Sequence, residues 1–382
     1  MAAAAGQNAG VERAFLAADS GQPMTAAARA ALDRALEIGW ADPGLRAHEG
    51  RVSRQLLEVA QSTVAASVDR PGAQVRFLPG TTAALRTALS AVLREARPAG
   101  AVAGGSLVAT STVDRLAAVD FDDGPRIAVD GRGRIDLAEL AAELQGGAVG
   151  AVCLQVGNPE VGTLQPLAAA AALCREAAVP LVVDATMAAG RTALPTEWDA
   201  LVLDAASWGG GVGVAAVVLA PQWGRQSAAG EGDCLPGIPA CAAAALALEA
   251  AQGDVDRRSG ADHAATTLLR RQMAALPGVE VHGDPVARLP HVVGCSAVYI
   301  DAEALLLELD RRGISVASGS ACATGGAGEA VGSPSHVLAA MGALTSGNIR
   351  VTLPIQYEPQ QLERLGAALP GALATLRAEA GL

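Results

Sequence analysis

The chain has 382 residues, which is enough for one large domain and a smaller one. Its net charge is −11, which argues against general electrostatic binding to nucleic acid. Hydrophobic residues make up 51% of the chain but aromatic residues only 2%, so the core must be built from alanine, valine and leucine.

Lysine is absent from the chain, because all 28 residues counted as lysine or arginine are arginines. An arginine guanidinium cannot act as the amine of a Schiff base. No side chain of this protein can therefore hold a carbonyl cofactor or substrate through such a bond.

The sequence lacks the patterns that are typical of a signal peptide, a membrane span or a cysteine metal site. Residues 1–10 lack the basic and apolar regions of a signal peptide, and no stretch is long and apolar enough for a membrane span. The cysteines show no metal-type pairing such as C-x-x-C; they are residues 153, 174, 234, 241, 295 and 322. We expect a cytoplasmic protein with reduced thiols and no metal site, and no direct contact with a membrane or nucleic acid.

The first part of the chain predicts two helices, a strand and a polar turn. The helices cover Ala26 to Ile38, with Thr25 as the N-cap, and residues 51–68. A strand over residues 75–78 is followed by a turn with Thr81 and Thr82, which opens the next helix. The turn offers backbone N–H groups and hydroxyls to an anion, although it could equally be an ordinary cap.

Short apolar runs in the middle of the chain predict the strands of a buried sheet. One run covers residues 150–156 and leads into a polar loop that starts at Asn158. Two further runs stop at Asp184 and Asp204, and the second is followed by Ser207 and a glycine cluster. Ligands bind at the carboxyl ends of strands in open α/β sheets, so we expect Asp184 and Ser207 at a binding site.

The pattern changes near residue 255 to helix, strand, strand and helix, which predicts a second domain. We place a large domain at residues 1–254 and a small one at residues 255–382, with the N-terminal segment as a candidate to pack on the small domain. A closing amphipathic helix is expected over residues 360–378.

Taken together, these segments resemble the cysteine desulfurases, in the class V aminotransferase group of pyridoxal-phosphate (PLP) enzymes. The resemblance implies a fold-type I α/β architecture, with a mostly parallel central sheet flanked by helices and a smaller α+β C-terminal domain. It implies that Asp184 pairs with the pyridine nitrogen of PLP. Ser207 stands where the family has its Schiff-base lysine.

Other matches imply further site residues. Thr81 and Thr82 correspond to the family's phosphate loop, and Asn158 to an asparagine that contacts the cofactor and lies near the substrate. Asn348-Ile349-Arg350 resembles the family's Ser-Ile-Arg, whose arginine binds the substrate α-carboxylate as a two-pronged donor. Arg350 in a strand could also serve a structural salt bridge.

The segment Ser318 to Cys322, Ser-Gly-Ser-Ala-Cys, is the most specific match. In the family, this cysteine attacks the substrate sulfur and carries it as a persulfide. Cys322 is thus the predicted catalytic residue, and reactivity would require its thiolate form. The alternative is that Cys322 is a small apolar residue or a relic.

Several family positions are not matched. Val113 and Asp114 stand where a histidine stacks on the cofactor, and Met187 replaces a glutamine. We therefore expect no covalent PLP, and any PLP that binds should be held without a covalent bond. Metal ligands are not expected.

Three hypotheses follow. The first is a desulfurase-like protein of sulfur transfer without PLP chemistry of its own. The second is an enzyme with altered PLP-type or PLP-free chemistry in the same pocket, and the third is a purely structural or regulatory subunit. The resemblance implies a homodimer, or a heterodimer with an active desulfurase, and a sulfur-acceptor protein as partner.

Overall fold

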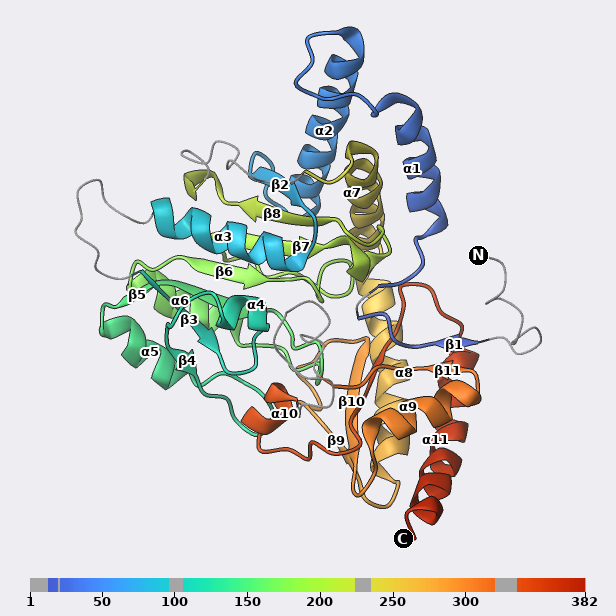
Figure 1. Cartoon of the computed structure of the whole chain (residues 1–382). Coiled ribbons are helices and arrows are strands. Elements are labelled where there is room, and N and C mark those ends of the chain that lie inside the picture. Colours follow the sequence, from blue (N-terminus) through green and yellow to red (C-terminus); the bar gives the residue numbers. More distant parts are fainter. Residues whose placement is uncertain (1–12, 20, 96–105, 224–234, 320–334, 382) are drawn as a thin grey trace.

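The computed structural model describes residues 13–19, 21–95, 106–223, 235–319 and 335–381 (Figure 1). Within these ranges, a seven-stranded sheet has the order β2-β8-β7-β6-β5-β3-β4. Only β8 runs antiparallel to its neighbours. The predicted α/β architecture with a mostly parallel central sheet is confirmed. The strands are β2 (Gln74–Leu78), β3 (Leu107–Ser111), β4 (Arg126–Ile127), β5 (Val149–Gln155), β6 (Leu181–Asp184), β7 (Ala200–Asp204) and β8 (Ala215–Leu219).

Alternating side chains of the strands supply two separate cores. Val182 and Val202 pack on one face of the sheet, while Val183 and Leu201 pack on the other. Successive side chains of a strand point to opposite faces, so a strand covered on both sides must be apolar throughout. This explains why the central runs are continuous and not alternating.

Helices cover both faces of the large sheet (Figure 1). Side chains of α3 belong to one core, and those of α5, α6 and α7 to the other. Thr25 caps α1 as predicted, since its hydroxyl accepts from the amide of Ala28. The helices of this part are α1 (Ala26–Ile38), α2 (His48–Ser67), α3 (Thr81–Glu95), α4 (Leu116–Val119), α5 (Leu137–Gln145), α6 (Leu167–Glu176) and α7 (Ile238–Gly253), and the 3-10 helices are η1 (Ala205–Trp208) and η2 (Pro221–Trp223).

The C-terminal part has its own small sheet, in the order β12-β10-β9, and its own core. Ala14 and Leu16 from the N-terminal segment pack in that core, and β1 pairs with β11. The boundary between residues 254 and 255 remains a prediction. The elements are β1 (Ala14–Phe15), α8 (Val255–Ala274), β9 (Val279–Val281), β10 (Val292–Ala297), α9 (Ala302–Arg311), β11 (Ile314–Ser315), α10 (His336–Ala340), β12 (Ile349–Thr352) and α11 (Pro359–Glu379).

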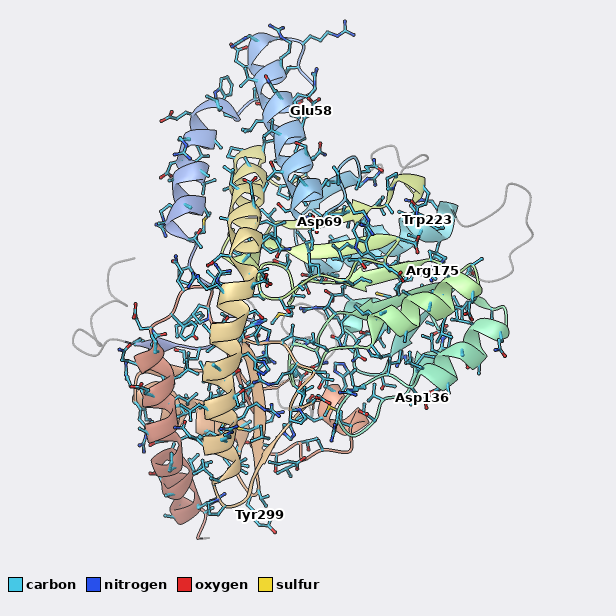
Figure 2. All side chains as sticks on the ribbon, turned by 180° about the vertical axis from the view of Figure 1, so that it is seen from behind. Glu58, Asp69, Asp136, Arg175, Trp223 and Tyr299 are labelled. Carbon is cyan, nitrogen blue, oxygen red and sulfur yellow. The ribbon has the colours of Figure 1, made fainter. Side chains whose placement is uncertain are left out.

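Helices α7 and α8 follow one another and run past both sheets (Figure 2). Arg191, only 1% exposed, adds a polar link between the two parts. Its guanidinium donates to the carbonyl of Ser207 at 2.8 Å and to that of Leu353 at 2.7 Å. Burial lowers the pKa of Arg191 to about 10. The segments after β7 and β12 are thus held together.

None of the helices in the described part of the chain combines the length and apolar character that crossing a membrane requires.

Candidate functional site

The predicted site residues Asp184, Thr81 and Ser207 lie at one edge of the large sheet. Asp184 ends β6, Ser207 follows β7 in η1, and Thr81 begins α3. The parallel strands β6 and β7 bring their carboxyl ends together, which is why residues distant in sequence meet there.

Asp184 is buried and already paired with a cation. Its Oδ2 atom lies 3.0 Å from Nε of Arg115, and the two side chains are 5% and 16% exposed. The other oxygen accepts from the hydroxyl and the amide of Thr186 at 2.5 and 2.9 Å. Arg115 also donates to the Thr186 hydroxyl at 3.0 Å. The guanidinium therefore supplies the positive charge that a buried carboxylate needs.

The N-terminus of α3 holds a carboxylate of the protein itself. The hydroxyl of Thr81 donates to Oδ2 of Asp204 at 2.5 Å, while Oδ1 accepts from the amide of Ala206 at 3.0 Å. Thr82 is exposed. A helix N-terminus attracts negative charge, and here Asp204 supplies it. The predicted turn is thus formed, with the carboxylate of Asp204 beside it. Its role as a phosphate loop stays a prediction.

Ser207 is buried within a network of the protein's own groups. Its hydroxyl donates to the carbonyl of Ala189 at 3.3 Å. Its carbonyl accepts from Gln22 at 3.0 Å, and the same Gln22 accepts from the amide of Ile355 at 2.5 Å. These contacts fix the position of the serine, but a hydroxyl cannot do the chemistry of a lysine amine.

Asn158 is fully buried and shapes its own loop. Its amide donates to the carbonyl of Val113 at 3.0 Å, and its side-chain oxygen accepts from the amides of Glu160 and Val161 at 2.8 and 3.0 Å. The loop forms at the end of β5, as the sequence indicates. Both polar atoms of the Asn158 side chain are therefore hydrogen-bonded within the protein.

Arg350 lies on β12, beside an unexpected partner. Its Nη2 atom is 2.5 Å from Oδ2 of Asp19, and each side chain is 5% exposed. Arg350 also donates to the backbone carbonyl of Gly319 at 3.3 Å. The backbone amide of Gly319 donates to the side-chain oxygen of Asn348 at 2.9 Å. These contacts fix the start of the predicted thiol loop. Cys322 itself lies outside the described residues.

The four cysteines within the described residues are all buried; they are Cys153, Cys174, Cys241 and Cys295. Burial raises the pKa of Cys174, Cys241 and Cys295 to about 12 and that of Cys153 well above its ordinary value. A thiol at such a pKa is almost entirely protonated at neutral pH and is a poor nucleophile.

The sequence prediction missed the residues that complete each pair. Asp204 is predicted only as the end of a strand, and neither Asp19 nor Arg115 is among the predicted site residues. One signal was available: a buried aspartate at position 184 needs a cation, and in a chain without lysine or a bound pyridinium only arginine or histidine can provide it.

The sequence of this chain is similar to a known protein family and to curated proteins. The family model described as aminotransferase class-V matches residues 46–218 and 233–365. A cysteine desulfurase of Cereibacter sphaeroides is 31% identical over 362 residues, covering 86% of this chain and 88% of that protein. A cysteine desulfurase of Rhodobacter capsulatus is 32% identical over 270 residues, covering 66% of this chain and 67% of that protein.

Solved structures share the fold at lower identity. A NifS-like protein from Rickettsia africae ESF-5 superposes with a TM-score of 0.81 at 18% identity, covering 95% of this chain and 100% of that one. The apo structure of a cysteine desulfurase from Thermococcus onnurineus NA1 gives 0.78 at 15% identity, covering 95% of each chain. These similarities confirm the predicted fold-type I architecture.

Proposed function

Because the chain belongs to the cysteine desulfurase family of the class-V aminotransferases, we propose that it takes part in sulfur transfer without PLP-dependent desulfuration of its own. The observation that carries the proposal is the absence of lysine from all 382 residues, with Ser207 at the family's lysine position. Without an amine there, the family's covalent bond to PLP cannot form.

The charges around the site support the same conclusion. PLP would bring a pyridinium to Asp184 and a phosphate to the start of α3. Arg115 already neutralises Asp184, and the carboxylate of Asp204 lies beside Thr81. A phosphate brought next to Asp204 would face a like charge in a partly buried site, which is unfavourable. The residues present therefore do not fit the cofactor, and we derive no step through it.

Sulfur transfer is then assigned to the thiol of Cys322. The motif Ser318 to Cys322 supports this role, as do the raised pKa values of the four buried cysteines, which make them unsuitable carriers. In a persulfide relay, the Cys322 thiolate attacks the outer sulfur of a donor's persulfide. The donor leaves as a thiolate, and Cys322 then holds the sulfur for an acceptor protein. No net oxidation or reduction is needed.

A structural or regulatory subunit is the second candidate, because the same internal pairs would also suit a protein that binds no ligand. We further propose that the protein acts as a dimer, either with a second copy or with a lysine-bearing desulfurase. Such a partner would supply the persulfide.

The test of the central proposal is to add PLP and L-cysteine to the purified protein. We expect no borohydride-stable pyridoxyl adduct on any side chain, and no alanine or sulfide above background. The chain is favourable for this experiment, because without lysine its α-amino group is the main amine that can react. A lysine-bearing desulfurase serves as the positive control. Release of alanine at an enzymatic rate would contradict the proposal.

A further inference from the structure

The N-terminal segment crosses from the C-terminal part of the molecule to the large sheet, on its way from β1 to α1 (Figure 1). Near its start, Leu16 makes one backbone hydrogen bond to β11 and one to β12, each of 2.8 Å. Near its end, the amide of Thr25 donates to the carbonyl of Gly209, directly after η1, at 3.0 Å. We call residues 13–19 and 21–25 the strap, because they are hydrogen-bonded to both parts.

Gln22 lies where the strap passes between the two parts, and its side chain binds both. The side-chain nitrogen donates to the carbonyls of Ala206 and Ser207 in η1, at 2.7 and 3.0 Å. The side-chain oxygen accepts from the amide of Ile355, which follows β12, at 2.5 Å. Gln22 is 8% exposed, so these hydrogen bonds are shielded from water. One amide group therefore connects η1 with the end of β12.

The apolar side chains of the strap divide between two cores. Ala14 and Leu16 pack in the core of the C-terminal part, whereas Met24 packs against a core of the large sheet. Of the described residues between Leu16 and Met24, none belongs to a hydrophobic core. The strap is thus anchored by apolar packing at each end, while its crossing point is held by polar contacts.

Arg191 forms a second link between the same two elements, and it does not belong to the strap. Its guanidinium donates to the carbonyls of Ser207 and Leu353. The carbonyl of Ser207 therefore accepts from both Gln22 and Arg191. Hydrogen bonds that share an acceptor form a network, so a change at one of them affects the other.

We infer that the strap is a conformational device in which Gln22 couples η1 to the end of β12. When the side chain of Gln22 releases its partners, both elements open together. Since η1 contains Ser207, the geometry of the predicted binding site depends on the position of the C-terminal part. This inference needs neither PLP nor Cys322, so it stands or falls separately from the proposed function.

The test is hydrogen exchange, resolved to single amides, in the unaltered protein and in Gln22→Leu. Leucine is similar in size to glutamine and lacks both hydrogen-bonding atoms. The informative amides do not contact Gln22. Gly210, after η1, donates to Ala205 at 2.9 Å, and Leu353, after β12, donates to His291 at 3.0 Å. We expect both amides to exchange at least about fivefold faster in the variant, because a lost hydrogen bond favours local opening.

Rates are taken relative to the amide of Val152, inside the large sheet, so that a general loss of stability cancels. The matched control is Gln61→Leu, which removes a hydrogen bond to the carbonyl of Val75 within the large part alone. It should leave Gly210 and Leu353 unchanged.

A faster exchange that is confined to the amide of Ile355 would overturn the inference, since Gln22 would then be an isolated contact. Equal acceleration of Val152 would also overturn it, because the opening would not be specific to the two elements. If Gln22→Leu does not fold, Gln22→Ser decides the outcome on the same criterion.

Discussion

At the scale of single residues, the buried acid Asp114 makes the stability of the protein depend on pH. Its two oxygens accept from the backbone amides of Ser111 and Gln155 at 2.7 and 3.0 Å, and it is 2% exposed. Burial raises its pKa to about 7 against the lowering effect of these bonds, and the charge of Asp184 adds to the rise. The folded protein therefore retains a proton on Asp114 at a pH where the unfolded chain has released it.

This predicts a stability difference that depends on pH. Asp114 contributes stability that is fully present below about pH 4 and is lost as the pH rises through about 7. Asp114→Asn removes the titration, whatever constant cost the substitution carries. The free energy of unfolding of the variant, relative to the unaltered protein, should rise by about 2 kcal/mol between pH 5 and pH 7. Urea unfolding at both values measures it, and a constant difference would contradict the assignment.

At the scale of elements, η1 and the start of α3 contain the positions that would contact PLP in the proposed comparison with the family. Ser207 lies in η1, and Asp204 connects β7 to both η1 and α3. Restoring the missing amine alone would leave the charge of Asp184 paired with Arg115 and the carboxylate of Asp204 at the helix start. Under our proposal, the internal pairs and the missing lysine are separate obstacles to PLP binding.

The predicted outcome is that Ser207→Lys by itself does not give tight PLP binding. Adding Arg115→Ala and Asp204→Ser to it should improve PLP affinity at least tenfold, because a cation and an anion that compete with the cofactor are removed. Arg115→Ala without the lysine is the control and should form no covalent adduct. Affinity is read from imine absorbance and borohydride trapping. If Ser207→Lys binds PLP as tightly as the triple variant, the internal pairs do not limit PLP affinity.

At the scale of the whole molecule, the consecutive helices α7 and α8 run past the seven-stranded sheet and the β12-β10-β9 sheet (Figure 2). The hydrogen bonds of Arg191 add a second link between the two parts. Hydrophobic side chains stay exposed on and between the projecting helices α1 and α2; they are Leu36, Ile38, Trp40, Leu45 and Val59, with exposed fractions of 50–69%. Exposed apolar side chains gathered in one region are typical of surfaces that meet another protein. They support the proposed dimer.

We predict that an active desulfurase, supplied with L-cysteine, places a persulfide on Cys322 of this protein. Alkylation and mass spectrometry locate the modification, and light scattering measures whether the two proteins form a heterodimer. Cys322→Ser should abolish the label, whereas the matched variant Cys234→Ser should keep it. Labelling of Cys322 no greater than that of Cys234 would favour the structural or regulatory subunit.

Local patterns in the sequence determined most of the fold. Apolar runs that end at Asp184 and Asp204 indicate buried strands, and Thr25 marks the start of α1, because both signals arise from neighbouring residues. Composition alone also determined that no lysine is available for a Schiff base, since a count does not depend on folding.

Only the tertiary structure decided which charges meet. Arg115 and Asp184 are 69 residues apart, Thr81 and Asp204 are 123 apart, and Asp19 and Arg350 are 331 apart. No local pattern links such partners, because ion pairs depend on distance in space and on exclusion of water. The sequence predicts Asp184, Thr81 and Arg350 as binding residues. In the folded chain, each of them is hydrogen-bonded to a side chain of the protein itself.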